Sequence, residues 1–510
     1  MQHRVLVSSF VALAVSGALV TACGDDDAST SLAPDGGSQT PDAGGSPSPD
    51  SGAAVGDAGS DADAQAEALA PIVPVSTTRI ANAINPYGLV FGSDGFLYAS
   101  GAMMDGAARK LAVWRFKDGA LDPTFGDEGV VTTDIPGDES SFDIVEVSSG
   151  NFVVHAVSGG KIWLVKLTND GGTFSFATPV FVKLGYDENE DWPAGTPNAP
   201  STPPSYQSWG IGVDRSNSAA PKIVVFASGA PAKSANVAGQ RIDNDRWITR
   251  VMADTLAFDP SFNGGSPFSA DADGKKLADN ARRGIVLADG SIVSAGYTNF
   301  GQGLGQHVVL IRLLPNGAVD PAFGFGTTAP TPGQTKFNPF SATGGTAEAY
   351  GVARQSSGRY VTTGYGVSNF DVASKSVDLV SFGANADGLD TTYGKLGALA
   401  WQSEKDKTAG LGTTPFTDRG RDVVVLADDR IVHAGAYDDH AGVFVTDKDG
   451  KADPQTGTSG LIEYAYPAAF FKVAVSPDGK QIAATAQSSN QTTDPAAPLG
   501  SVLAVLKVGQ

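Results

Sequence analysis

A five-residue turn that recurs along the chain constrains its fold more than any other feature. It reads Asp122-Pro-Thr-Phe-Gly126 and returns, with substitutions, at 259–263, 320–324, 390–394 and 453–457. Aspartate can cap backbone N–H groups, proline fixes φ, and glycine or asparagine accepts a positive φ. The aromatic residue is expected to pack between neighbouring sheets. A turn repeated in this way indicates one supersecondary unit used several times.

Short apolar segments surround each turn in a constant order. From Tyr87 to Ile135 they read YGLVF, FLYASGA, LAVWRF and GVVTTDI, separated by turn signals. β-Branched residues and alternation predict four strands for each unit. Seven such units fit in residues 71–510, and the sequence predicts an all-β, seven-bladed β-propeller. A ring of six or eight blades is the alternative.

The two ends of this region predict how the ring closes. The last unit, 468–510, stops after its third strand, and the missing strand is supplied by Ile72–Ile80, which precedes the first unit as GVVTTDI precedes the second. Pairing the two ends hides the edges that an open sheet would expose. Residues 71–510 are therefore expected to form one domain.

With these residues in view, the chain resembles the delta-60 repeat family of bacterial exported proteins. The resemblance rests on the DGxLDPxFG turn, the following GVVTT strand and the DG turn between first and second strands. It is strong around Asp122 and Asp320, and weak in the second unit, where residues 169–172 lack the DPxFG pattern. The family implies tandem propeller-type repeats and no catalytic residues.

The N-terminus carries an export signal. Arg4 precedes an apolar run from Val5 to Val20 that is shorter than the roughly 20 residues of a spanning helix. The run ends in Val-Thr-Ala-Cys23, which resembles a bacterial lipobox, and Cys23 is the one cysteine of the chain. Residues 1–23 are thus predicted to be a lipoprotein signal peptide, with Cys23 as the lipidated residue; a plain signal peptide is the alternative.

Residues 24–70 are predicted to be a disordered linker. They hold ten acidic residues and no Lys, Arg or aromatic residue, so they cannot bury enough apolar surface to fold. Half of the formal net charge of −20 lies in this short segment. Gly24 follows the cysteine, which favours sorting to the outer membrane, on its periplasmic side or at the cell surface.

Composition and motifs exclude several function classes. The acidic balance argues against nucleic-acid binding. A single cysteine excludes a disulfide framework and a cysteine-based zinc site. No metalloprotease, nucleophile-elbow, P-loop or dinucleotide motif is present. His155 and His433 fall within predicted strands and are expected to be core residues. No cofactor and no metal are expected.

Candidate ligand-binding residues lie on the face of the ring that carries the long connections. The first–second and third–fourth turns are short, whereas second–third loops and the connections between units are long, and function often resides on such loops. Residues at the start of the first strands are expected to ring the mouth of the channel. They are Tyr87, Trp209, Arg283, Tyr350, Arg419 and Arg421, with Phe142 and Phe470 in similar places. The alternative is that these residues plug the channel.

Other polar groups offer weaker signals. Asp438, Asp439 and His440 form a polar cluster on the long-loop face and are ligand-binding candidates; a metal site and a solvated loop are the two interpretations. Residues 447–453 and 271–274 resemble parts of calcium loops but lack the closing glutamate. Acidic residues in 187–191 have the residue type of a glycosidase pair, although adjacent acids are usually solvated.

Three functions fit these observations. The first is a non-enzymatic, lipid-anchored propeller that binds a protein or a glycan, or acts as a scaffold, through the long-loop face. The second is a hydrolase or lyase acting on polysaccharide, which predicts acids with His or Tyr converging at the channel mouth. The third is a periplasmic assembly scaffold. No catalytic residue is assigned from the sequence.

Overall fold

β-Strands of two to ten residues, joined by turns, build the described part of the chain. The protein is described by a computed structural model. It describes residues 70–106, 108–137, 140–185, 206–232, 243–272, 277–299, 306–324, 332–340, 345–368, 378–386, 388–402, 418–438, 440–487 and 500–509. These all belong to the compact unit Glu67–Gln510. The described residues include no helix that is long and apolar enough to cross a bilayer.

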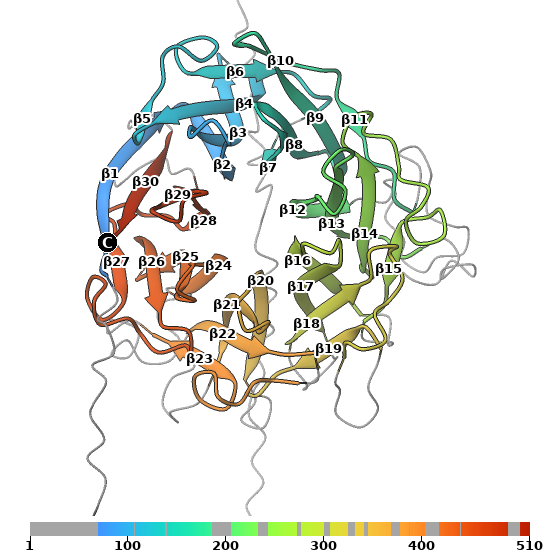
Figure 1. The fold of residues 1–510 in the computed structure, drawn as a ribbon, viewed down its shortest axis with the longest axis vertical. Helices are drawn as coiled ribbons and strands as arrows, with labels where there is room; N and C mark the ends of the chain where they lie inside the picture. The colour runs from blue at the N-terminus through green and yellow to red at the C-terminus, as the bar shows by residue number, and fades with distance from the viewer. Residues whose placement is uncertain are drawn as a thin grey trace, which may run out of the picture. The chain divides into compact units, whose positions relative to one another are not determined.

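The strands in the described residues form seven antiparallel sheets, and Figure 1 shows them arranged as blades around a centre. The innermost strands, in blade order 1 to 7, are β2 (Ala83–Phe91), β7 (Ser140–Ser148), β12 (Tyr206–Asp214), β16 (Asp279–Val286), β20 (Thr346–Arg354), β24 (Arg419–Val425) and β28 (Phe470–Val475). The second strands are β3 (Leu97–Asp105), β8 (Asn151–Ser158), β13 (Lys222–Gly229), β17 (Ile292–Asn299), β21 (Tyr360–Val367), β25 (Ile431–Tyr437) and β29 (Gln481–Ala486).

The third and outer strands complete each blade. The third strands are β4 (Ala108–Lys117), β9 (Lys161–Asp170), β14 (Asp245–Met252), β18 (Gln306–Leu313), β22 (Asp378–Ala384), β26 (His440–Thr446) and β30 (Gly500–Val508). The outer strands are β5 (Ala120–Leu121) and β6 (Val130–Thr133), β10 (Thr173–Phe176) and β11 (Val180–Phe181), β15 (Phe268–Ala270), β19 (Gln334–Phe337), β23 (Ala398–Trp401), β27 (Leu461–Glu463) and, in blade 7, β1 (Ile72–Ala81). The predicted seven-bladed propeller is confirmed.

The ring closes as the sequence predicted. Strand β1 pairs antiparallel with β30, from Ile72 opposite Val508 to Ala81 opposite Gly500. In Figure 1 the blue β1 therefore lies beside the red β30, so the two ends of the propeller share one blade. A second contact fastens this strand, because the backbone N–H of Ile72 donates to Thr456 Oγ1 of blade 6 at 3.4 Å. Closure pairs the outer edge of β30, which the last unit alone would leave unpaired.

Apolar side chains fill the spaces between blades. Between blades 4 and 5, Val293 and Leu310 pack with Ala349, Val380 and other buried residues. The same arrangement recurs between blades 6 and 7, where Val432 and Val443 meet Val473 and Ile482. β-Strands present alternate side chains to opposite faces, so each blade contributes to two such layers. The sheets are held face to face by this packing, which places the innermost strands around the channel.

Long connections gather at one end of the innermost strands. In blades 3, 4, 5 and 7 the second and third strands are joined by residues 230–244, 300–305, 368–377 and 487–499. In an antiparallel blade these connections lie at the same end as the entry to the innermost strand. We call this end of the ring the long-loop face and the opposite end the short-turn face.

Candidate functional site: the channel of the propeller

Every innermost strand carries a β-bulge close to its beginning. The register with the second strand shifts between residues 84 and 88, 141 and 143, 208 and 210, 281 and 284, 349 and 351, 420 and 422, and 470 and 472. A bulge leaves a residue unpaired and re-aims its side chain. We define the bulge ring as the large side chains at these shifts: Tyr87, Phe142, Trp209, Arg282, Arg283, Tyr350, Arg421 and Phe471.

The bulge ring contains most of the residues that the sequence placed at the channel. Tyr87, Trp209, Arg283, Tyr350 and Arg421 all stand at a register shift, as does Phe142. Because each shift lies near the start of an innermost strand, the seven blades bring these side chains to a similar level of the channel.

Two positions differ in detail from the sequence alignment. In blade 7 the residue at the bulge is Phe471, the neighbour of Phe470. In blade 6 it is Arg421, whereas Arg419 is paired with Ala436 just before the bulge. Alignment by the following glycine missed both shifts, since a bulge changes the register by one residue without leaving a composition signal.

Aromatic rings of the bulge ring close the channel by packing on one another. Tyr87 stacks on Phe471 with ring centres 4.2 Å apart and lies 5.5 Å from Phe142. Trp209 contacts Phe142 at 5.2 Å and Tyr350 at 6.1 Å. Tyr87, Phe142, Tyr350 and Phe471 are buried, whereas Trp209 is partly exposed. The plug that the sequence offered as an alternative is thus present in this part of the channel.

A charged layer ties distant blades together next to these rings. The guanidinium of Arg283 in blade 4 lies 3.6 Å from Asp143 in blade 2 and 3.8 Å from Asp422 in blade 6. Lys472 in blade 7 contacts the same carboxylates at 3.2 and 3.7 Å. Two cations and two anions therefore balance, which offsets the cost of burying them. Sequence analysis missed the role of Asp143, Asp422 and Lys472, which depends on contacts across the channel.

Asp143 and Asp422 also join their own blades to the blades that follow them in the ring. Asp143 Oδ2 accepts the backbone N–H of Ile211 in blade 3 at 3.2 Å, and Asp422 Oδ2 accepts that of Val473 in blade 7 at 3.1 Å. In both cases the carboxylate follows the bulge of its own strand. These contacts join blades that are neighbours in the ring and blades that face one another across the channel, so the layer contributes to ring assembly.

A second group of arginines is interleaved with tyrosines on one side of the channel, in blades 4 to 6. Arg282 lies over Tyr350 at 4.6 Å and Tyr297 at 5.1 Å, and its Nη2 donates to both hydroxyls at 3.2 Å. Arg421 lies over Tyr350 at 4.7 Å, and Arg419 over Tyr365 at 4.5 Å. We call these six residues, with Glu348, the arginine–tyrosine cluster.

Glu348 is the acidic member of this cluster. It is 5% exposed, and it lies directly opposite Tyr365, whose hydroxyl donates to it. Burial raises the pKa of Glu348 to about 7, against the lowering influence of Arg282. Burial and the Glu348 charge also raise the pKa of Tyr365. The Glu348 carboxyl therefore changes protonation near neutral pH, while Tyr365 keeps its proton.

The arginine–tyrosine cluster leaves buried polar atoms without hydrogen-bond partners. Arg282 is 7% exposed, and its Nε has no partner; the same is true of Glu348 Oε2. Arg282 also lies 5.1 Å from the ring of Trp209, which together with Tyr365 is partly exposed. An unpartnered buried donor, an unpartnered buried acceptor and two partly exposed aromatic rings thus lie together at the long-loop end of the channel.

Sequence reasoning found only part of this cluster. Arg282 is the neighbour of the predicted Arg283, and Glu348 lies two residues before Tyr350, which places both on one side of their strand. Tyr297 and Tyr365 end the second strands of blades 4 and 5, opposite residues 280 and 348. A polar residue two positions before the bulge residue, together with a tyrosine near the end of the next strand, would have been a usable sequence signal for this cluster.

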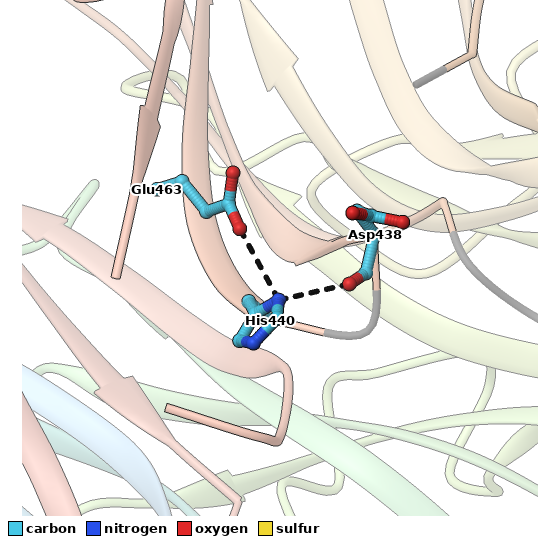
Figure 2. Close-up of side chains that lie close together, drawn as sticks. All are labelled: Asp438, His440 and Glu463. Atoms are coloured by element: carbon cyan, nitrogen blue, oxygen red, sulfur yellow. Dashed lines mark hydrogen bonds and ion pairs between the residues drawn. The ribbon is translucent and has the colours of Figure 1, made fainter. Parts of the chain in front are cut away.

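In the structure, Glu463 joins Asp438 and His440 in the polar cluster at the β25–β26 turn (Figure 2). His440 Nδ1 lies 2.9 Å from the backbone oxygen of Asp438 and 3.2 Å from Glu463 Oε1 of β27. Asp438, His440 and Glu463 offer ligand atoms within 4.8 Å of one another. Asp439 and Cys23 lie outside the described residues.

These contacts suit a solvated turn better than a metal centre. Both oxygens near Nδ1 are acceptors, so these contacts are satisfied by the tautomer that carries its proton on Nδ1, without an ion. The side chains of His440 and Glu463 are 39% and 44% exposed. Water competes strongly with such a pair, so the contacts add little stability.

The remaining histidine and aspartate candidates have structural roles. His155 and His433 are fully buried, and burial lowers the pKa of each to about 3, which leaves them neutral. Their predicted placement in the core is confirmed. Asp447 Oδ1 accepts the backbone N–H groups of Asp449 and Lys451 at 2.9 Å, as in an ordinary turn. Residues 187–191 and 273–274 lie outside the described ranges.

Comparisons with known proteins agree with this architecture. A family model described as a domain of unknown function (DUF5122) beta-propeller matches residues 287–323, which lie in blade 4. No curated protein matches the sequence. The delta-60 resemblance therefore stays a prediction from the sequence.

The solved structures that resemble this chain share little sequence identity with it. The polysaccharide lyase Uly1 is 8% identical with a TM-score of 0.45, covering 86% of this chain and 100% of that one. Sqt1 of Chaetomium thermophilum, bound to the N-terminus of ribosomal protein L10, is 9% identical with a TM-score of 0.43, covering 85% and 99%. The Dos1 propeller is 10% identical with a TM-score of 0.41, covering 86% and 95%. Likeness at this level concerns the fold alone.

Proposed function

We propose that this protein is an exported, lipid-anchored binding module that holds an acidic glycan at the long-loop end of its channel. The observation that carries the proposal is the arginine–tyrosine cluster, in which Arg282 is stacked between aromatic rings with its Nε unpartnered. A guanidinium held in this way is pre-organised to donate to a carboxylate.

The aromatic neighbours favour a carboxylated sugar as the ligand. Trp209 and Tyr365 are the partly exposed rings, and flat aromatic faces offer large contact area at low entropic cost. Glu348 Oε2 is a buried acceptor without a partner, and a sugar hydroxyl can donate to it. A uronic acid combines the carboxylate, the hydroxyls and the apolar ring face that these three groups would engage.

Attachment to the membrane is a second part of the proposal. Lipidated Cys23 would anchor the chain at the outer membrane, and residues 24–70 would form a linker with a reach on the order of 40 Å. Cys23→Ala should move the protein from the membrane fraction of the producing cells to the soluble fraction. If the variant stays in the membrane fraction, the anchor is elsewhere.

A polysaccharide hydrolase or lyase is the second candidate, and Glu348 is the observation that favours it. A buried carboxyl with a pKa of about 7 is suited to general acid–base work at neutral pH. The tyrosines argue in the other direction, because the raised pKa of Tyr365 makes it a poor base. Binding without turnover is therefore the better-supported function.

An array of acidic glycans, neutral glycans and protein ligands, followed by product analysis, separates these functions. We expect retention of uronic-acid oligosaccharides without new chain ends after long incubation. Accumulation of shortened or unsaturated products, lost in Glu348→Gln, would establish the enzyme instead. Retention of neutral glycans or proteins alone would contradict the proposed ligand class.

A further inference from the structure

The recurring turn builds a specific joint between neighbouring blades. Its aspartate pairs with an arginine of the same blade: Arg115 with Asp122 at 2.8 Å, Arg250 with Asp259 at 2.8 Å, Arg312 with Asp320 at 3.2 Å, Arg359 with Asp390 at 2.7 Å and Arg430 with Asp453 at 3.2 Å. The other carboxylate oxygen accepts the N–H two residues on, as for Thr124 and Ser261 at 3.0 Å. The ion pair thus fixes the turn against the third strand in blades 1, 3 and 4, and against the residue that precedes the second strand in blades 5 and 6.

The aromatic residue of the turn fills a space between its own blade and the next. Phe125 lies 5.8 Å from Tyr98 and 4.8 Å from Phe174 of blade 2. Phe323 of blade 4 lies edge-on to Tyr360 of blade 5 at 5.7 Å. Phe262 and Tyr393 do the same in blades 3 and 5, and all four residues are buried.

A backbone hydrogen bond completes the joint. The residue after the aromatic donates its N–H to a carbonyl in the third–fourth turn of the next blade. Asn263 donates to Asn316 at 2.7 Å, and Gly394 donates to Asp449 at 2.7 Å. Each complete joint therefore consists of an acid, an aromatic side chain and one N–H, all held in a fixed order.

Blade 2 lacks this turn. Its third strand leads through residues 169–172 into β10 and then β11, without an acid and an aromatic in the required order. Lys166 holds the place of the joint arginine, since it pairs with Val153 as Arg115 pairs with Tyr98 and Arg250 with Val224.

Among the residues that the structure describes, no turn carboxylate pairs with Lys166. Its ammonium group contacts blade 3 instead. Its Nζ donates to the backbone oxygen of Asp254 at 2.6 Å. Asp254 corresponds in blade 3 to Asn316 in blade 4, because each is the third residue after the strand position paired with Ile223 or Ile292. The lysine therefore occupies the acceptor that the missing turn would have used.

A cleft of about 350 Å³ lies where the missing joint would be. Its walls combine Lys166 and Thr168 of β9 with Phe152 of β8 and, from blade 3, Ala219, Met252 and Asp254. Most of the surface is apolar, and the cation stands at one side. This volume falls within the range of natural ligand pockets. The cleft opens at the short-turn face, away from the arginine–tyrosine cluster.

We propose that this cleft binds a peptide turn of a partner protein that carries an acidic residue followed three residues later by an aromatic one. The acid would pair with Lys166, the aromatic ring would enter the cleft beside Phe152 and Met252, and the next N–H would donate to Asp254. The blades that have the joint show that this residue pattern fits this geometry. Charge complementarity and cavity size argue for such a segment and against a neutral or basic one.

A synthetic peptide that copies residues 121–128 of this chain is the direct probe. Added to the full chain, it should bind saturably with a Kd below about 1 mM, measured by fluorescence anisotropy. A peptide with alanine in place of the phenylalanine should bind at least about tenfold more weakly, since that ring supplies most of the buried apolar area.

Variants of the protein locate the site. Lys166→Glu should weaken binding by about tenfold or more, and Ala219→Trp should abolish it by filling the cleft. Lys161→Glu, at the other end of β9, is the matched control and should leave binding unchanged. Circular dichroism and thermal melting would verify that each variant is folded. No saturable binding, or binding unaffected by both cleft variants, would overturn the proposal; occupation of the cleft by another segment of this chain would appear as the first of these results.

Discussion

Single residues decide how charge is distributed in the channel. Arg283 is matched by Asp143 and Asp422, whereas Glu348 is buried with one carboxylate oxygen unpartnered. In the first arrangement each charged group has a partner of opposite sign close by. The second depends on pH, because burial favours the neutral form of Glu348.

The raised pKa of Glu348 predicts a pH-dependent stability. The folded-state pKa is about 7 and the ordinary value is 4.5, so the folded protein binds this proton more tightly than the unfolded chain. Stability should then fall as pH rises from 4.5 to 7, by about 3 kcal/mol from this group. Glu348→Gln removes this titration. The difference in free energy of unfolding between the variant and the wild type should therefore shift in favour of the variant by about this amount as pH rises from 4.5 to 7.

Chemical denaturation of both proteins at several pH values between 4 and 8 measures this difference. Asp118→Asn, which changes an exposed acid in the turn between β4 and β5, serves as the control and should follow the wild type. If the free energies of unfolding of the wild type and Glu348→Gln change in parallel with pH, the Glu348 carboxyl is not held in the buried site described above.

The recurring turns add a second set of contacts between neighbouring blades, beside the apolar packing of their sheets. Phe262 is fully buried between blades 3 and 4, and its neighbour Asn263 adds the backbone hydrogen bond to the next blade. The turn is thus a fastening between sheets rather than a surface connection. This explains why its aspartate, aromatic and glycine or asparagine recur together.

Removing the aromatic of one turn should therefore cost as much as a core deletion. Phe262→Ala is expected to destabilise the propeller by about 3–5 kcal/mol, because the cavity between blades 3 and 4 can collapse only in part. Leu396→Ala removes a side chain that is 65% exposed near the equivalent turn of blade 5, and should stay within about 0.5 kcal/mol of the wild type. Equal losses for the two variants, measured by urea denaturation, would contradict the fastening role.

The strands could be predicted from the sequence, and the features that could not be predicted have physical causes. Alternating apolar residues and turn signals predicted the strands and the closing strand β1, since both depend on local pattern. The bulges were not predicted, because they arise from packing around a narrow channel. The partner of Lys166 and the cleft beside it were also missed, although the absent turn in blade 2 was visible in the sequence.

The whole molecule separates two surfaces at opposite ends of one ring. The long-loop face holds the arginine–tyrosine cluster, and the short-turn face holds the cleft between blades 2 and 3. Half of the formal net charge of −20 lies in residues 24–70, so the propeller is less acidic than the whole chain. The candidate site depends on contacts between residues of blades 3 to 7, which only the closed ring brings together.

The most direct test of this account is a calorimetric titration of the full chain with a galacturonic acid trimer. We predict saturable binding that weakens about tenfold or more in Arg282→Met and in Arg421→Met, since each would remove a charged hydrogen-bond donor. Arg354→Met, an exposed arginine at the far end of β20, should bind like the wild type. Equal affinity for a neutral trisaccharide, or unchanged affinity in both cluster variants, would contradict the proposal that the arginine–tyrosine cluster recognises acidic glycans.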